Sequence, residues 1–99
     1  MCDNTITEIF PAKWPLSVHQ TLDQRKRILY GLQIPQKDIC CDVITKTAYV
    51  KSHTKKTTQE FYTVTLNSCD CYDFVHRNLP CKHMYALCFA IIRYLPGID

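Results

Sequence analysis

Residues 69–83 read CDCYDFVHRNLPCKH, and this short stretch decides how the chain can fold. It contains two pairs of potential metal ligands, a CxC pair and a CxH pair, separated by nine residues. Zinc binds four soft or borderline donors in a tetrahedron, and two pairs on separate segments can close around one ion. The predicted ligands of a single zinc ion are Cys69, Cys71, Cys81 and His83.

The spacing within each pair constrains the backbone around it. In an extended chain, residues i and i+2 project to the same face, so Cys69 and Cys71 can bind one metal. On a helix the same spacing separates two side chains by about 200°. Cys81 and His83 must therefore straddle the start of a helix. Pro80 suits this position, because a proline costs nothing in the first turn.

Other interpretations of this stretch are weaker. His76 lies in the intervening loop and could replace His83 as the fourth ligand. An iron–sulfur centre is disfavoured because such centres usually use four thiolates. A reduced protein could also keep these thiols as small buried side chains, but the ordered spacing argues against that explanation.

The longer stretch CDCYDFVHRNLPCKHMYAL resembles the core of a SWIM-type zinc finger, whose pattern is CxC, a variable loop and CxH. Asp73 and Phe74 after the first pair, and Leu79 and Pro80 before the second, also match that pattern. The similarity covers about residues 47–95. The chain is similar to short bacterial or mobile-element proteins that contain a SWIM domain. It implies zinc binding with DNA or protein recognition, and no catalysis.

Residues 1–38 are predicted to contain an extended N-terminal segment followed by one helix. Residues 1–20 contain two prolines and show little periodicity, so we expect them to be loosely structured. Thr21 with Gln24 forms a capping-box signature, which predicts a helix from about Thr21 to Leu32. The apolar stripe expected to face the core comprises Leu22, Ile28, Leu29 and Leu32. The basic residues expected on the opposite, solvated face are Arg25, Lys26 and Arg27.

Three β-rich segments follow, at residues 39–44, 47–53 and 60–66, and we expect two hairpins to join them. The turns are expected at 45–46 and 54–59. In the third segment Tyr62, Val64 and Leu66 alternate onto one face. Cys40 and Cys41 are adjacent, so one is expected in the core and the other on the surface.

A final helix is expected to begin near Pro80 and to end before Pro96. Its core-facing positions at helical spacing are Met84, Leu87, Cys88, Ile91 and Leu95. Tyr85, Phe89 and Ile92 widen the apolar face beyond what one sheet covers, so they are expected to contact the N-terminal helix or a partner.

The fold class predicted from these patterns is a small zinc-stapled α+β domain with an N-terminal helix, a β-meander or hairpin, a zinc knuckle and a C-terminal helix. Residues 1–38 are expected to form an N-terminal arm with one helix, and residues 39–99 the SWIM-like zinc-binding domain.

The composition of the chain indicates its cellular compartment and limits the kinds of partner that it can bind. The chain has 99 residues, seven cysteines and a formal charge of +3. An odd cysteine count without a signal peptide predicts an intracellular protein, cytoplasmic or nuclear. No apolar run approaches the roughly 18 residues that a membrane span needs. The mild positive charge permits nucleic-acid contact without requiring it.

The expected function is recognition of DNA or of another protein, with no small-molecule substrate. The residues expected to contact nucleic acid are Lys51, Lys55, Lys56, Arg77 and Lys82. An alternative is a protein adaptor that uses the apolar face of the last helix. A cysteine- or zinc-dependent hydrolase is remote, because four protein ligands leave zinc no open position.

Overall fold

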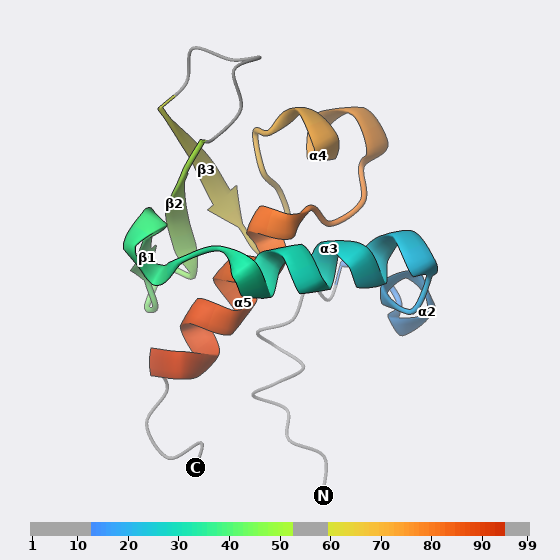
Figure 1. Ribbon diagram of the computed structural model, residues 1–99, viewed down its shortest axis with the longest axis horizontal. Helices are drawn as coiled ribbons and strands as arrows, with labels where there is room; N and C mark the ends of the chain where they lie inside the picture. The colour runs from blue at the N-terminus through green and yellow to red at the C-terminus, as the bar shows by residue number, and fades with distance from the viewer. Residues whose placement is uncertain (1–12, 53–59, 95–99) are drawn as a thin grey trace, which may run out of the picture.

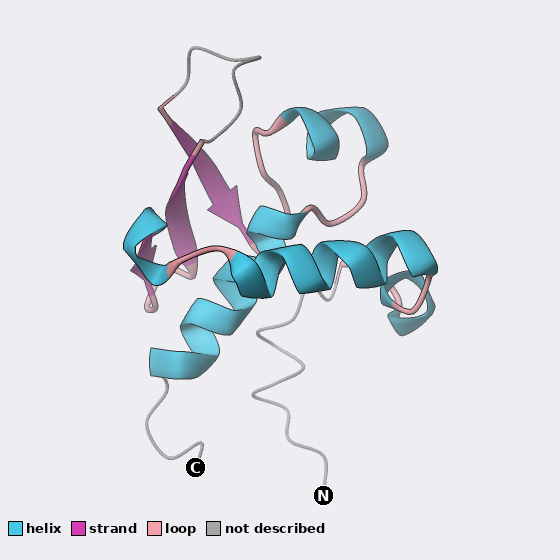
Figure 2. Ribbon diagram, viewed as in Figure 1, coloured by secondary structure: helices cyan, strands magenta, loops and turns pink. Residues whose placement is uncertain are grey.

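The computed structural model describes residues 13–52 and 60–94, in which a three-stranded sheet and the helix α5 form one core and α3 crosses α5 (Figure 1). Figure 2 shows the same view by secondary structure, with the strands at the upper left and α4 to their right. The elements are α2 (Leu16–His19), α3 (Leu22–Gln33), the 3-10 helix η1 (Gln36–Asp38), β1 (Ile39–Asp42), β2 (Thr47–Lys51), β3 (Phe61–Thr65), α4 (Tyr72–Arg77) and α5 (Lys82–Tyr94).

The sheet is an antiparallel meander in the order β1-β2-β3, as the β-rich segments predicted. Each strand lies within its predicted segment and is shorter than predicted. Lys46 takes a left-handed backbone with φ of 56° in the first turn, which supplies the geometry a glycine would otherwise give. The second predicted turn, at 54–59, lies outside the described residues.

One face of the sheet is buried and the other faces solvent. Ala48, Val50 and Val64 are at most 1% exposed, and Tyr62 is buried beside them. Cys41 packs against this core, whereas Cys40 on the opposite face is exposed, so the predicted division of the two thiols is confirmed.

The helix α5 covers the inner face of the sheet. Four of its predicted core positions, Met84, Leu87, Cys88 and Ile91, are 0% exposed, which confirms the predicted helical spacing, and the fifth, Leu95, lies outside the described residues. The extra apolar surface meets the N-terminal helices, because the Tyr85 hydroxyl lies 2.6 Å from Nδ1 of His19. Gln24 of α3, the helix predicted to contact this face, also donates to the Tyr85 hydroxyl at 3.1 Å.

The helix α3 forms as predicted, but the stripe predicted to face the core was wrong. Thr21 caps the helix by accepting a hydrogen bond from the Gln24 amide at 3.4 Å. Leu22, Leu29 and Leu32, however, are 67%, 58% and 48% exposed. The residues of α3 that are fully buried are Gln24 and Gly31.

Close approach of two backbones explains this reversal. A Cβ added at Gly31 would lie 2.8 Å from the Lys82 carbonyl oxygen and 3.0 Å from the Ala86 nitrogen. The two helices cross at the residue that has no side chain, so the leucines on the other sides of α3 face solvent.

Residues 1–12 of the predicted lead segment lie outside the described residues, and residues 13–20 differ from the expectation of loose structure. Leu16–His19 form the short helix α2, and His19 is only 4% exposed. Within residues 13–52 and 60–94, no helix combines the length and the apolarity needed to cross a bilayer.

Candidate metal centre

The four predicted ligands come from three places in the fold. Cys69 pairs with Val64 in an isolated antiparallel bridge after β3, and Cys71 is the N-cap of α4. Cys81 directly precedes α5, where its carbonyl accepts the amide of Met84 at 3.1 Å. His83 lies in the first turn of α5, so the CxH pair straddles a helix start as its spacing predicted.

The ligand atoms converge on one small volume. Sγ of Cys69, Cys71 and Cys81 and one ring nitrogen of His83 all lie within 4.8 Å of one another, and all four residues are buried. Nδ1 of His83 is 3.8 Å from Sγ of Cys69 and 3.7 Å from Sγ of Cys81. A tetrahedron with Zn–S near 2.3 Å and Zn–N near 2.0 Å has S···N edges of about 3.5 Å. The donor set therefore fits a single zinc ion.

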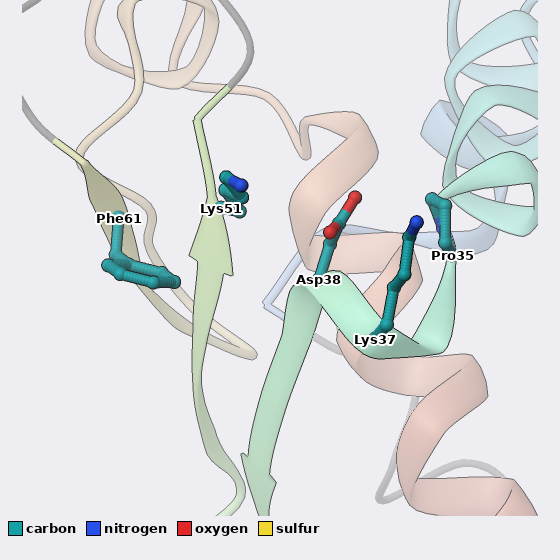
Figure 3. Close-up of a pocket in the computed structure, with 5 residues that line it drawn as sticks. All are labelled: Pro35, Lys37, Asp38, Lys51 and Phe61. Atoms are coloured by element: carbon teal, nitrogen blue, oxygen red, sulfur yellow. The ribbon is translucent and has the colours of Figure 1, made fainter.

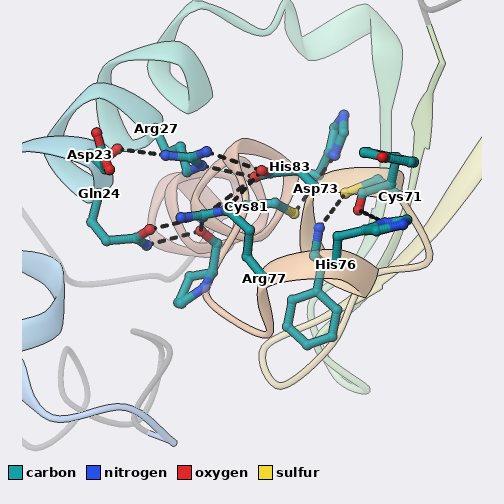
Figure 4. Close-up of polar contacts among 12 residues, drawn as sticks. Asp23, Gln24, Arg27, Cys71, Asp73, His76, Arg77, Cys81 and His83 are labelled. Atoms are coloured by element: carbon teal, nitrogen blue, oxygen red, sulfur yellow. Dashed lines mark hydrogen bonds and ion pairs between the residues drawn. The ribbon is translucent and has the colours of Figure 1, made fainter.

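His76, the alternative fourth ligand, lies elsewhere. It is exposed, its Nδ1 is 3.0 Å from the carbonyl oxygen of Tyr72, and its ring stacks on the Tyr72 ring at a centroid distance of 3.7 Å. Figure 4 shows His76 and His83 on different sides of the cluster.

The three thiols perturb one another strongly. The Cys69 thiol donates to Cys71, which raises the pKa of Cys69 and lowers the pKa of Cys71. The contact with Cys69 lowers the pKa of Cys81, but Cys71 and burial outweigh it and raise that pKa to about 12. Zinc, when bound, would stabilise the deprotonated form of all three cysteines and would join the two segments of chain that carry the ligands.

The nine residues between the ligand pairs contain a helix that was predicted as a loop. The helix α4 is capped at its N-terminus by Cys71, whose Sγ accepts the Phe74 amide at 3.5 Å, and at its C-terminus by Asn78, which has a φ of 56°. An acidic residue in the first turn, Asp73, and Arg77 four residues later are the signals that could have identified it.

A buried amide connects α3 to the metal-binding segment. Gln24 is 1% exposed, and its Nε2 donates to the Pro80 carbonyl at 2.9 Å and to the Tyr85 hydroxyl at 3.1 Å. Its Oε1 accepts from Nη2 of Arg77 at 2.9 Å. Because Pro80 precedes Cys81, this residue of α3 fixes the chain next to a metal ligand (Figure 4).

A second link runs through Asp73. Arg27 of α3 binds both carboxylate oxygens, at 2.8 and 3.0 Å, and Arg77 binds the same carboxylate at 2.8 Å. Burial alone would raise the pKa of Asp73, but the two guanidinium groups hold it below its ordinary value. Arg27 was predicted on a solvated face, and its pairing with Asp73 was not predicted because the two residues are 46 positions apart in the sequence.

The residues expected to contact nucleic acid are dispersed over several elements. Lys51 ends β2 and Lys82 begins α5, and both are exposed. Arg77 is engaged with Asp73 and Gln24. Lys55 and Lys56 lie outside the described residues.

Comparison with known proteins is consistent with this geometry. Residues 62–92 match the family model described as the SWIM zinc finger. No curated protein and no solved structure shows a significant match to the chain. The matched segment contains all four clustered residues in the order CxC, nine residues, CxH. Residues 62–92 are therefore a SWIM zinc finger.

Proposed function

We propose that the protein is an intracellular, non-catalytic module that recognises nucleic acid. Its zinc ion has a structural role and stabilises the fold. The closed donor set carries the first part of this proposal. Cys69, Cys71, Cys81 and His83 supply four protein ligands, whereas catalytic zinc keeps one position open for water or substrate. A hydrolase built on this site is disfavoured for that reason.

The distribution of exposed groups favours nucleic acid over an adaptor built on α5. Tyr85, at the centre of the face expected to bind a protein, is 0% exposed, and Ile92 packs against the core. Lys51 and Lys82 are exposed, and neither forms an ion pair with another residue of the described chain. Such cations are available to neutralise phosphates.

Binding measured against salt tests the proposal. The zinc-loaded protein should bind a labelled oligonucleotide, with log K falling linearly as log salt rises. Lys51→Gln and Lys82→Gln should each reduce that slope by about 0.9 on a duplex, or about 0.7 on a single strand. The double variant of Lys55 and Lys56 is expected to act in the same direction.

Arg93→Gln near the end of α5 is the charge-matched control, and it should leave the slope unchanged. Absence of binding at low salt would contradict the nucleic-acid part of the proposal. A protein partner would then be sought at the exposed leucines of α3, Leu22 and Leu29.

A further inference from the structure

The solvent-facing side of the sheet carries two exposed aromatic rings. Tyr49 of β2 is 52% exposed and Phe61 of β3 is 44% exposed. The register places Tyr49 opposite Thr63 and Phe61 opposite Lys51, so both rings lie on the face turned away from α5. The two residues are diagonal neighbours, and no ring contact joins them among the described residues, so each ring offers its own surface.

A hollow of about 600 Å³ lies beside Phe61. Figure 3 shows Phe61 and Lys51 on adjacent strands and Lys37 and Pro35 across from them. The residues that line this hollow are Pro35, Lys37, Asp38, Lys51 and Phe61. Neither Lys37 nor Lys51 forms an ion pair within the described chain, whereas Asp38 already takes part in another interaction.

From this arrangement we propose that the outer face of the sheet binds unpaired nucleotides, with bases stacked on Tyr49 and Phe61 and phosphates beside Lys37 and Lys51. The inference rests on the proposed function and deepens it by naming the surface and the form of nucleic acid. Stacking suits exposed rings because every base has a π-face, and lysines hold the backbone without reading sequence.

The composition of this face argues against two other occupants. Around the rings lie Cys40, Lys51 and Thr63, so the apolar surface is interrupted. A stable protein interface buries about 800 Å² on each partner around an apolar centre, and two separated rings do not supply one. In a duplex the base faces are stacked on one another and hidden, so the rings could not reach them.

The experiment compares three labelled probes of about 12 nucleotides: oligothymidylate, oligouridylate and a DNA duplex. The zinc-loaded protein should bind the single strands more tightly than the duplex. Tyr49→Leu and Phe61→Leu keep apolar bulk and remove the π-face, and each should weaken single-strand binding by roughly five- to hundredfold. Equal affinity for the two single strands would assign the site to unpaired nucleotides generally, and a difference would assign it to the tighter of DNA and RNA.

Two further variants separate stacking from folding. Tyr72→Leu removes a 69% exposed aromatic ring from α4 and should leave binding unchanged. Phe61→Trp keeps a stacking surface and should bind at least as tightly as the wild type. Zinc content and thermal midpoint should be unaltered in every variant compared.

The possible failures are distinguishable. Binding that persists in Tyr49→Leu and Phe61→Leu, or duplex affinity equal to that of the single strands, overturns the sheet-face proposal and leaves the proposed function standing. Absence of binding by the wild type to all three probes overturns both. If the leucine variants lose zinc, their loss of binding could come from unfolding, and Phe61→Trp then decides. A zinc-loaded Phe61→Trp protein that no longer binds single strands would contradict stacking on residue 61.

Discussion

Gln24 shows how one side chain outside the matched SWIM segment can control the metal-binding backbone. Its amide bonds the Pro80 carbonyl, the Tyr85 hydroxyl and Arg77, and it is 1% exposed. Gln24→Ala would leave these partners unsatisfied in a buried site, so we expect it to lower the free energy of unfolding by about 1–3 kcal/mol.

Chemical denaturation of the zinc-loaded protein measures this effect. Gln33→Ala, at the exposed end of the same helix, is the matched control and should change stability by less than about 0.5 kcal/mol. Equal effects of the two substitutions would show that the Gln24 bonds do not contribute.

Cys88 gives the protein a pH dependence that is separate from the zinc ligands. Burial raises the pKa of Cys88 to about 12, whereas a thiol in an unfolded chain has a pKa of about 8.5. The unfolded chain therefore loses its proton first as pH rises. The stability that the neutral thiol contributes is fully present below about pH 8.5 and is lost progressively up to about pH 12.

The test compares the wild type with Cys88→Ala across that window. The difference in free energy of unfolding should narrow by up to about 1.4 kcal/mol per pH unit. Cys40→Ala, at an exposed thiol, should show the wild-type slope. Parallel curves for the wild type and Cys88→Ala would contradict the predicted ionisation.

Single residues also show what sequence reasoning can find. The four metal ligands were predictable because zinc requires particular donor atoms at spacings that fix the local backbone. Gln24 was not, because in the sequence it looks like half of a capping box. Only the fold reveals that its side chain turns to Pro80 instead of the N-cap.

At the scale of elements, the crossing of α3 and α5 depends on a missing side chain. A Cβ at Gly31 would meet backbone atoms of Lys82 and Ala86 at 2.8 and 3.0 Å. Alanine is the better helix former by about 1 kcal/mol, but here it would force the helices apart. We expect Gly31→Ala to destabilise the protein by about 1–3 kcal/mol and to weaken zinc binding, because Lys82 lies between Cys81 and His83.

Competition with a zinc indicator and thermal unfolding would measure both effects. Leu29→Ala on the exposed side of α3 is the control and should leave zinc affinity unchanged. A stabilised Gly31→Ala protein would mean that helix propensity outweighs the close approach.

The elements divide into those with local signals and those set by tertiary contacts. The strands and α5 were predicted because their alternation and helical spacing follow from burial on one face. The same logic failed for α3, since the leucines that form its apparent stripe are exposed and a glycine and a glutamine are buried instead. Helix spacing cannot reveal a crossing set by backbone contact.

At the scale of the whole molecule, the finger and the N-terminal helices form one structure. Trp14 packs edge-on against Phe74 at a centroid distance of 6.0 Å and donates to the Asn78 carbonyl at 3.1 Å. Zinc binding supplies folding free energy, often about 10 kcal/mol in small zinc domains. Chelation should therefore disorder the finger and release α2 and α3 from α5 together.

Trp14 is the only tryptophan in the chain and reports this coupling directly. Its emission should shift to longer wavelength with the same chelator dependence as the loss of helical circular dichroism, and added zinc should reverse both. Unchanged Trp14 emission in a chelated protein would mean that the N-terminal helices remain docked without the metal.

The zinc content of purified variants shows whether Cys69, Cys71, Cys81 and His83 hold one zinc ion. Elemental analysis should find about one zinc per wild-type chain, a small residue in Cys71→Ser and His83→Ala, and full zinc in His76→Ala. Full zinc in His83→Ala together with its loss in His76→Ala, or a metal-free wild-type protein that is fully folded, would contradict a zinc site built from these four ligands.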